Sequence, residues 1–293
     1  MENHEPARLE KHPDNIPPAK RLKIRGAVVR MLRVAILSYV GVCAVFFCMQ
    51  RSLLFPGAPP PSSTPRSMGL PFEEFHLSVG GESTHGWRIS VENARGTVIF
   101  SHGNAARMDD LYTAGIFASL GFNVVQYAYG GYGNSTGKTS EKRCYNDIRA
   151  VWKWLTEEKG EKPERIVLAG RSLGGAVTAQ LAGEVSPAAV ILESTLTSTA
   201  DTAGEMLPWL PVYPLVLDRF NSAGKMVKIH APVLVIHSPY DTLINYRLGR
   251  RLFELANEPK SFLELHGDHN EGFFIDRNNY TNGLKKFLDG VFK

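Results

Sequence analysis

The chain has 293 residues, of which 43% are hydrophobic and 21% charged, so it can bury one large core and is too apolar to be disordered throughout. Its net charge of +4 lies entirely in residues 1–33, and the remainder is neutral, which argues against a nucleic-acid-binding surface. Three cysteines without a C-x-x-C spacing argue against a disulfide framework and against a redox or thiolate metal motif.

The N-terminal segment is polar and then basic. Four prolines fall within its first 18 residues, and six Lys or Arg residues follow between positions 20 and 33. Such a composition cannot bury enough apolar surface to fold by itself. We therefore expect residues 1–33 to form a disordered basic tail.

An uncharged run follows at 34–50, and as a helix it spans roughly 26 Å, slightly less than a ~30 Å bilayer core. Arg51 can snorkel, which extends the span to residue 55. We interpret 34–55 as a transmembrane signal anchor. The alternatives are a cleaved signal peptide, disfavoured by the long leader without a small-residue cleavage site, and a core or interfacial helix, disfavoured by apolar residues on every face.

The charge bias of the flanks predicts an orientation. Lys and Arg accumulate before the apolar run, so the N-terminus is expected in the cytoplasm. The rest of the chain would then lie on the opposite side, in the periplasm, the lumen or the extracellular space. Membrane lipid is the partner that this segment predicts, and nothing in the sequence identifies a protein partner.

The segment 56–69 is rich in Pro and Ser and is expected to be a semi-extended linker. The folded domain is then expected over 70–293, with short apolar strands alternating with amphipathic helices. Strands are expected at 72–79, 84–91, 96–100, 123–127, 165–169, 188–192, 232–237 and 261–265. Helices are expected at 111–120, 140–159, 175–182, 246–256 and 280–292. Residues 195–226 break this rhythm with three prolines among apolar side chains, which predicts a helical cap.

This alternation of strands and helices predicts an α/β fold with a parallel sheet that begins antiparallel. The stretch that organises it is the sequence 165–176, a buried strand followed by G-x-S-x-G and a small-residue helix. That context is typical of a nucleophile elbow, in which a strained turn raises the hydroxyl of Ser172 above the sheet. The alternative is an ordinary helix start in which Ser172 is an N-cap.

Acids and histidines follow the other strands. In open α/β sheets, ligands bind outside the carboxyl ends of the strands, so these side chains are expected to converge. Ser172, Asp241 and His269 occur in the chain order that this kind of fold uses for nucleophile, acid and base. A serine hydroxyl needs a base to remove its proton, and a carboxylate fixes the tautomer of that base.

Two rivals remain at this point. Glu193 also follows a strand and is an alternative acid, and His266 is an alternative base. Asp241 would otherwise be a turn acid, and His269 a loop histidine. The expected oxyanion-binding groups are the backbone N–H of Leu173, directly after the nucleophile, and that of Asn104, in the loop after the third strand.

No His, Asp or Glu grouping has a convincing metal spacing, so we predict no metal. The glycine-rich stretch 129–133 lacks the G-x-x-x-x-G-K pattern, so phosphate binding and a nucleotide cofactor are not expected either. His76, His85 and His237 are interpreted as structural or surface residues.

Several motifs together resemble the BEM46-like group of membrane-anchored α/β hydrolases, which is also similar to the serine aminopeptidase group. They are S-H-G-N-A at 101–105, Y-G-G-Y-G at 129–133, G-R-S-L-G-G at 170–175, E-S-T at 193–195, Asp241, and His269-Asn270. The resemblance covers roughly residues 50–293. It implies an eight-stranded sheet with a Ser–Asp–His triad, and some members are described as protein depalmitoylases.

The sequence departs from the family pattern in one loop. Where the family reads D-Y-R-G-Y-G, this chain has Ala128 and Gly130 in place of the acid and the arginine. The family's H-G before the triad acid is Ser238-Pro239 here.

The expected function is a membrane-anchored serine hydrolase acting on carboxylic esters or thioesters through an acyl-enzyme. The apolar cap and the anchor favour a lipid-like acyl chain, including palmitoyl. One alternative is an aminopeptidase-like peptidase, for which Glu205 and Asp218 are too few acids to form an amine site. The other is a catalytically silent, membrane-tethered binding module.

Overall fold

The computed structural model describes residues 18–293 and divides at Cys48/Met49 into two units. Helix α1, Pro18–Leu54, begins in the first unit and ends in the second. Residues 18–33 are therefore helical, and the expectation of disorder is wrong for them, because Ala, Leu, Lys and Arg favour helix. The part of the expected tail at 1–17 lies outside the described residues. Among the described helices, α1 is long and apolar enough to cross a membrane, since it contains an 18-residue stretch with a mean hydropathy of 2.1.

The segment expected to be a linker is attached to the domain. The backbone N–H and hydroxyl of Ser62 both donate to Asp109 Oδ2 at 2.7 Å, and Gly133 N–H donates to Ala58 O at 2.9 Å. Pro65 is buried at the start of a short 3-10 turn, Pro65–Met68. The compact unit accordingly begins at Met49, not at residue 70, because this proline-rich chain finds partners on the domain surface.

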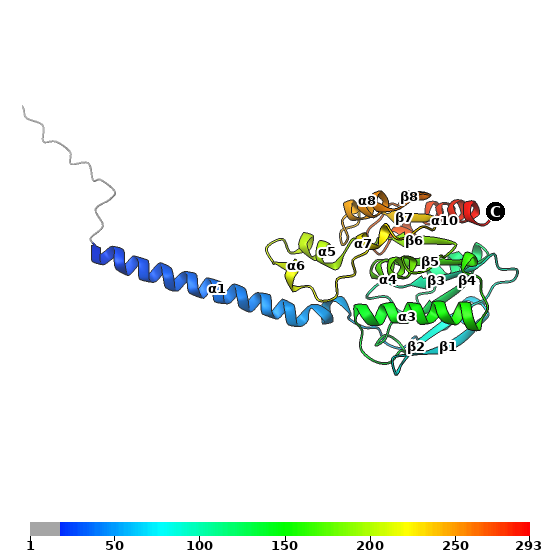
Figure 1. Ribbon diagram of the computed structural model, residues 1–293, viewed down its shortest axis with the longest axis horizontal. Coiled ribbons are helices and arrows are strands. Elements are labelled where there is room, and N and C mark those ends of the chain that lie inside the picture. Colours follow the sequence, from blue (N-terminus) through cyan, green and yellow to red (C-terminus); the bar gives the residue numbers. More distant parts are fainter. Residues whose placement is uncertain (1–17) are drawn as a thin grey trace, which may run out of the picture. The chain divides into compact units, whose positions relative to one another are not determined.

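The second unit is built on an eight-stranded sheet (Figure 1) with the order β1-β2-β4-β3-β5-β6-β7-β8. The strands are β1 Phe72–Val79, β2 Glu82–Ile89, β3 Thr97–Ser101, β4 Asn123–Tyr127, β5 Ile166–Arg171, β6 Ala189–Glu193, β7 Val233–His237 and β8 Lys260–Glu264. All eight lie within one or two residues of their predicted positions. The pairs β1–β2 and β2–β4 are antiparallel and the others are parallel.

A tight turn starts the sheet. Gly80 and Gly81 connect β1 to β2, and both have positive φ, 60° and 86°. A two-residue hairpin of this twist requires left-handed backbone at both positions, which glycine adopts without a Cβ clash. Val79 and Glu82 therefore pair directly across the strands.

Helices cover both faces of the sheet. They are α2 Tyr112–Ser119, α3 Glu141–Lys153, α4 Leu173–Ala182, α8 Tyr246–Leu255, α9 Gly272–Ile275 and α10 Arg277–Val291. The connection through α2 runs from β3 to β4 in one direction along the sheet, whereas those through α3, α4 and α8 run in the other. Because parallel crossovers are right-handed, α2 lies on the face opposite to α3, α4 and α8.

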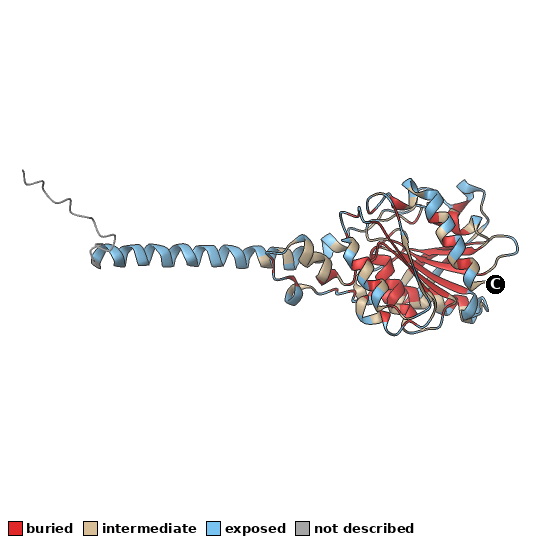
Figure 2. Cartoon of the chain, turned by 90° about the horizontal axis from the view of Figure 1, so that it is seen from above, coloured by how far each residue is buried: buried red, intermediate tan, exposed pale blue. Residues whose placement is uncertain are grey.

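The strands between these helix layers are fully buried (Figure 2), as the red colour of the central sheet shows. β3, β4, β5, β6 and β7 are mainly apolar and buried on both faces, because helices cover both sides of the sheet. The helix predicted over 140–159 is α-helical to Lys153 and then closes with a π-helical turn, Trp154–Glu158.

The cap contains three short helices, α5 Thr199–Met206, α6 Val212–Leu215 and α7 Ala223–Met226. Buried Asp218 fixes its end to the domain, since it accepts hydrogen bonds from Arg51 Nε and from the backbone N–H of Glu141, both at 2.8 Å. Gln50 donates to Leu215 O and accepts from Leu217 N–H. The cap is therefore held at both the start of α3 and the end of α1.

The strand order creates a switch point between β3 and β5. From β3 the chain adds β4 on one side, and it then returns to add β5 on the other side of β3. At such a switch point, the loops after neighbouring strands diverge and leave a crevice at their carboxyl ends. The loops after β3 and β5 carry Asn104 and Ser172.

Candidate active site

Ser172 lies in the turn between β5 and α4, with φ 55° and ψ −122°. A non-glycine residue in this region is strained, and it persists only where the surroundings enforce the conformation. Its backbone N–H donates to Glu193 O at 2.8 Å, which ties the turn to the neighbouring strand β6. The backbone therefore has the geometry of the predicted nucleophile elbow.

Two glycines make this turn possible. A Cβ on Gly170 would overlap the backbone of Gly174, and a Cβ on Gly174 would overlap the carbonyl groups of Ser101 and His102. Strand β5, helix α4 and the loop after β3 are consequently closer together than side chains at these positions would allow.

Three side chains from distant parts of the sequence form one hydrogen-bonded chain. His269 Nε2 lies 3.0 Å from Ser172 Oγ, and His269 Nδ1 lies 2.7 Å from Asp241 Oδ2. An ionised carboxylate only accepts hydrogen bonds, so Nδ1 carries the proton and Nε2 is left to accept from the serine hydroxyl. This arrangement can remove the proton from Ser172 as the oxygen attacks a carbonyl carbon.

Asp241 is fixed from several sides. Its Oδ1 accepts the backbone N–H groups of Leu243 and Ile244, at 3.0 and 2.7 Å. His237 Nε2, which lies 2.9 Å from Ile244 O, is also 3.4 Å from Asp241 Oδ2. Burial opposes the charge of Asp241, but the hydrogen bonds from His237 and His269 outweigh it and hold the pKa of this carboxyl well below its usual range.

The two rival residues have other partners. Glu193 forms an ion pair with Arg171 Nε at 2.7 Å and accepts from Tyr280 Oη at 2.9 Å. His266 is exposed and faces Asp276. His237, predicted to be a structural or surface residue, contacts Asp241 through its ring, and its position four residues before this acid is the sequence signal for the contact.

The two residues predicted to bind an oxyanion, Leu173 and Asn104, belong to segments next to Ser172. Leu173 is the first residue of α4, so its N–H has no acceptor within the helix. The loop after β3 passes close by, since a Cβ on Gly103 would be 3.6 Å from Ser172 Cβ. Asn104 follows Gly103, and its carbonyl accepts from Tyr132 Oη at 2.7 Å while its side chain donates to Leu54 O at 3.3 Å.

His102 holds this loop in place through a hydrogen bond to its backbone. Its Nδ1 lies 2.7 Å from Gly103 O, and its ring packs against those of Tyr129 and Tyr132. Burial lowers the pKa of His102 to about 4, although the bond to Gly103 acts in the opposite direction. The imidazole is therefore neutral at physiological pH, and its low pKa makes it a weak base.

A cavity of about 380 Å³ opens at these residues. Its lining combines Ser172 and His269 with the loop 103–107 and with side chains of the strands and of Phe273. None of the described residues at 195–226 belongs to this lining. The cavity therefore gives no support to the expectation that an apolar cap binds a lipid-like acyl chain. Arg171 does line the cavity, with its guanidinium 3.5 Å from the ring centroid of Phe273.

The loop that departs from the family pattern is supported by α3 instead. Asp147 accepts from the backbone N–H of Gly130 at 2.9 Å and from Arg143 Nε at 2.7 Å. The guanidinium of Arg143 occupies the space where a Cβ on Gly130 would lie. The Arg143–Asp147 ion pair of α3 therefore lies beside this loop and leaves no room for a side chain at Gly130.

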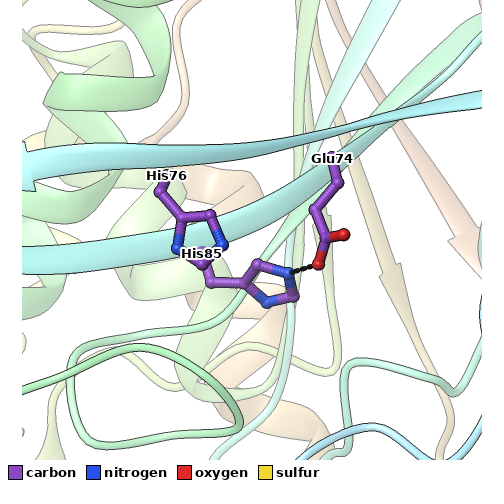
Figure 3. Close-up of side chains that lie close together, drawn as sticks. All are labelled: Glu74, His76 and His85. Carbon is purple, nitrogen blue, oxygen red and sulfur yellow. Dashed lines mark hydrogen bonds and ion pairs between the residues drawn. The ribbon is translucent and has the colours of Figure 1, made fainter.

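One group of potential metal ligands occurs among the described residues, away from this cavity (Figure 3). It comprises Glu74, His76 and His85, whose ligand atoms lie within 4.8 Å of one another. His76 and His85 are direct cross-strand partners, and Glu74 lies two residues before His76 on the same face of β1. In a hairpin over 72–91, side chains alternate between the two faces, so these three residues could have been placed on one face from the sequence. Their spacing along the chain alone did not indicate a metal site. A hydrogen bond between His85 Nε2 and Glu74, at 2.5 Å, joins two of these three side chains.

Comparison with known proteins agrees with this geometry. Residues 92–221 match the family described as serine aminopeptidase, S33. An uncharacterized protein of Mycobacterium tuberculosis (strain H37Rv) is 33% identical over 87% of this chain and 93% of its own length. Human alpha/beta hydrolase domain-containing protein 17B is 35% identical over 204 residues, which are 67% of each protein.

Solved structures share the fold at lower identity. The Pyrococcus furiosus esterase Pf2001 superposes with a TM-score of 0.70 at 20% identity, over 81% of this chain and all of its own. The Pyrococcus horikoshii acylaminoacyl peptidase gives a TM-score of 0.59 at 16% identity, over 75% of this chain and 41% of its own. With its eight-stranded sheet, its elbow and these relatives, the chain belongs to the BEM46-like group of α/β hydrolases that includes the alpha/beta hydrolase domain-containing 17 proteins.

Proposed function

We propose that this hydrolase is a membrane-anchored serine hydrolase that cleaves carboxylic esters or thioesters through an acyl-enzyme. The observation that carries the proposal is the hydrogen-bonded chain from Asp241 through His269 to Ser172, at 2.7 and 3.0 Å. Three side chains separated by up to 97 residues have no structural need to be aligned in this way, whereas nucleophilic catalysis requires it.

In the first half of the reaction, Ser172 Oγ forms a bond to the acyl carbon as His269 Nε2 takes its proton. The tetrahedral intermediate then collapses, the bond to the leaving oxygen or sulfur breaks, and His269 returns the proton to that atom. In the second half, His269 removes a proton from water as the water oxygen bonds to the acyl carbon. The bond from that carbon to Ser172 Oγ then breaks, His269 returns the proton to Oγ, and the carboxylic acid leaves. Asp241 stabilises the imidazolium that forms in each half.

The developing oxyanion is assigned to the backbone N–H groups of Leu173 and Asn104. The start of α4 adds favourable electrostatics, because helix N-termini carry partial positive charge. Tyr132 and His102 hold the backbone around Asn104 by hydrogen bonds to Asn104 O and Gly103 O. Donors fixed in advance are worth more than mobile ones, since they need no reorganisation during the reaction.

The anchor is assigned to α1, and its orientation is proposed from charge. Basic residues concentrate in the part of α1 before Val34, so the N-terminus would be cytoplasmic and the hydrolase unit would face the other side. Protease protection with tags at both ends tests this orientation: a C-terminal tag digested from the cytoplasmic side would contradict it.

Ester cleavage is favoured over peptide cleavage, although the matching family is described as a serine aminopeptidase. The two acids considered for binding a substrate amine both have cationic partners. Glu205 pairs with Arg247, and Asp218 pairs with Arg51. Neither acid lines the cavity at Ser172.

The proposal is tested with a fluorophosphonate probe in membranes that contain the full-length protein. Such probes react with a serine only when a base has activated it. We expect strong labelling of the wild type, none of Ser172→Ala, and unchanged labelling of the control Ser119→Ala, whose hydroxyl bonds to Ile116 O on α2. Labelling that survives in Ser172→Ala would refute the nucleophile, and a folded but unlabelled wild type would favour a binding module.

A further inference from the structure

The cavity at Ser172 contains a buried hydrogen-bond acceptor that the reaction mechanism does not use. Gln126, on β4, lines this cavity and is only 1% exposed. Its Oε1 has no hydrogen-bond partner among the described residues. Buried polar atoms are almost always hydrogen-bonded, so we expect a ligand to supply the hydrogen-bond donor that this oxygen lacks.

The orientation of the Gln126 amide is fixed by the protein. Its Nε2 donates to two backbone carbonyls, Met108 O at 2.7 Å and Asp110 O at 3.2 Å. Reversing the amide would bring Oε1 against those two carbonyl oxygens, so the oxygen and not the nitrogen must remain unpartnered. The site is therefore specifically an acceptor.

A second buried acceptor lines the same cavity. His102 Nδ1 lies 2.7 Å from Gly103 O, so it carries the proton, and Nε2 is the unprotonated nitrogen. That Nε2 also has no partner within the described part of the chain. Both unpartnered atoms of this lining are neutral acceptors, so the matching ligand group is a donor.

The position of Gln126 in the sheet indicates which part of a substrate it meets. Gln126 pairs with Phe100 across β3 and β4, so both side chains belong to the strand-built part of the cavity. The leaving alcohol or thiol must diffuse out while the acyl group stays bonded to Ser172. The strand-built part consequently suits the acyl group.

Building on the serine hydrolase function proposed above, we propose that Gln126 is a specificity-determining residue that selects acyl groups carrying a hydroxyl. A neutral donor fits better than an ammonium ion, because both unpartnered acceptors of the lining are uncharged. An alkyl chain placed against Oε1 leaves this acceptor unpaired, whereas a hydroxyl group on the acyl chain can donate to it. A missing bond of this kind costs about tenfold to a hundredfold in kcat/KM.

The test compares kcat/KM for matched pairs of p-nitrophenyl esters with the full-length protein in detergent. The pairs are 3-hydroxybutyrate with butyrate and 6-hydroxyhexanoate with hexanoate. We expect the wild type to prefer the hydroxylated member of at least one pair by tenfold or more. In Gln126→Leu and Gln126→Met, which both remove the acceptor, the ratio for that pair should fall toward one.

The ratio is independent of the amount of active enzyme, and having two variants protects against the failure of one to fold. Gln180→Leu, the same change on α4 outside the cavity lining, should keep the wild-type ratio. A wild-type ratio near one, a ratio unchanged by both Gln126 variants, or a preference for 3-aminobutyrate over 3-hydroxybutyrate would each overturn the inference. If none of the four esters is cleaved in a Ser172-dependent way, the failure lies with the proposed function instead.

Discussion

At the scale of single residues, two acids lie close to His269, and only one contacts its ring. Asp241 reaches Nδ1 at 2.7 Å, whereas Asp268, the preceding residue in the chain, accepts from the backbone N–H of His269 at 2.7 Å. Adjacent residues rarely direct their side chains at one another, so the more distant acid in sequence is the one positioned to orient the imidazole. The difference between the two contacts makes the assignment testable.

Asp241→Asn should lower kcat by about 10⁴, because an amide can donate to Nδ1 and so stabilise the wrong tautomer of His269. Asp268→Asn, which leaves the ring contacts intact, should cost less than about tenfold. The measurement is the turnover of a p-nitrophenyl ester, with thermal melting to confirm folding. Equal losses in the two variants would contradict the assignment of Asp241.

His102 predicts a pH dependence of stability. Its pKa is lowered from 6.5 to about 4 by burial, so between these values the unfolded chain binds a proton that the folded protein does not. The free energy of unfolding is therefore unaffected by His102 above pH 6.5. It falls by about 1.4 kcal/mol per pH unit as the pH drops toward 4, and by roughly 3 kcal/mol in all.

The measurement is urea unfolding in detergent at several pH values, for the wild type and for His102→Gln. The difference between their unfolding free energies should shrink as pH falls from 6.5 to 4 and stay constant below that. Burial also lowers the pKa of His85, but His85 is present in both proteins and cancels in the comparison. Parallel curves for the two proteins would show that His102 is not responsible.

At the scale of elements, close packing of β5, α4 and the loop after β3 depends on residues without side chains. Gly174 is the clearest case, since a Cβ there would overlap backbone carbonyls, which cannot move aside as the end of a flexible side chain can. Gly183, which follows α4 immediately, has its nearest neighbour, Lys228 Cβ, 3.5 Å from the position of an added Cβ. The two glycines lie at opposite ends of α4, and only Gly174 has backbone atoms where a Cβ would lie.

Gly174→Ala should lower the free energy of unfolding by about 3 kcal/mol or more and abolish fluorophosphonate labelling, because the elbow must shift to accommodate the methyl group. Gly183→Ala should change stability by less than about 1 kcal/mol and leave labelling intact. Denaturant unfolding and probe labelling together check both. A stable, fully labelled Gly174→Ala protein would show that the turn has more room than the structure indicates.

At the scale of the whole molecule, α1 is the proposed means of attachment to a membrane. Val40 and Cys43 lie near the middle of its uncharged stretch. Arginine at the centre of a membrane helix costs about 3 kcal/mol in insertion assays, so two such changes exceed what a span of marginal length tolerates.

The double substitution Val40→Arg and Cys43→Arg should move the protein from the membrane pellet to the supernatant after alkaline carbonate extraction. Leu22→Arg, in the basic part of the same helix, should leave it in the pellet. If the double variant stays in the pellet, α1 is not what holds the protein there.

The sequence by itself determined the positions of the strands to within two residues, because apolar runs and turn residues are local signals. It also determined the elbow at Ser172, since G-x-S-x-G between a strand and a helix is one contiguous motif. Chain order then predicted Asp241 and His269 as its partners, and the structure brings these three side chains together. Their catalytic roles are a matter for the variants described above.

Only the tertiary structure decided what depends on contacts between distant segments. The linker at 56–69 packs on the domain through Asp109, the cap does not line the cavity, and Arg143 fills the space beside Gly130. The unpartnered oxygen of Gln126 could likewise be found only in the structure, because whether a buried atom has a partner depends on every segment around it. A one-dimensional pattern records which faces are apolar and where the chain turns, but the partners of a side chain are fixed only when the sheet is assembled.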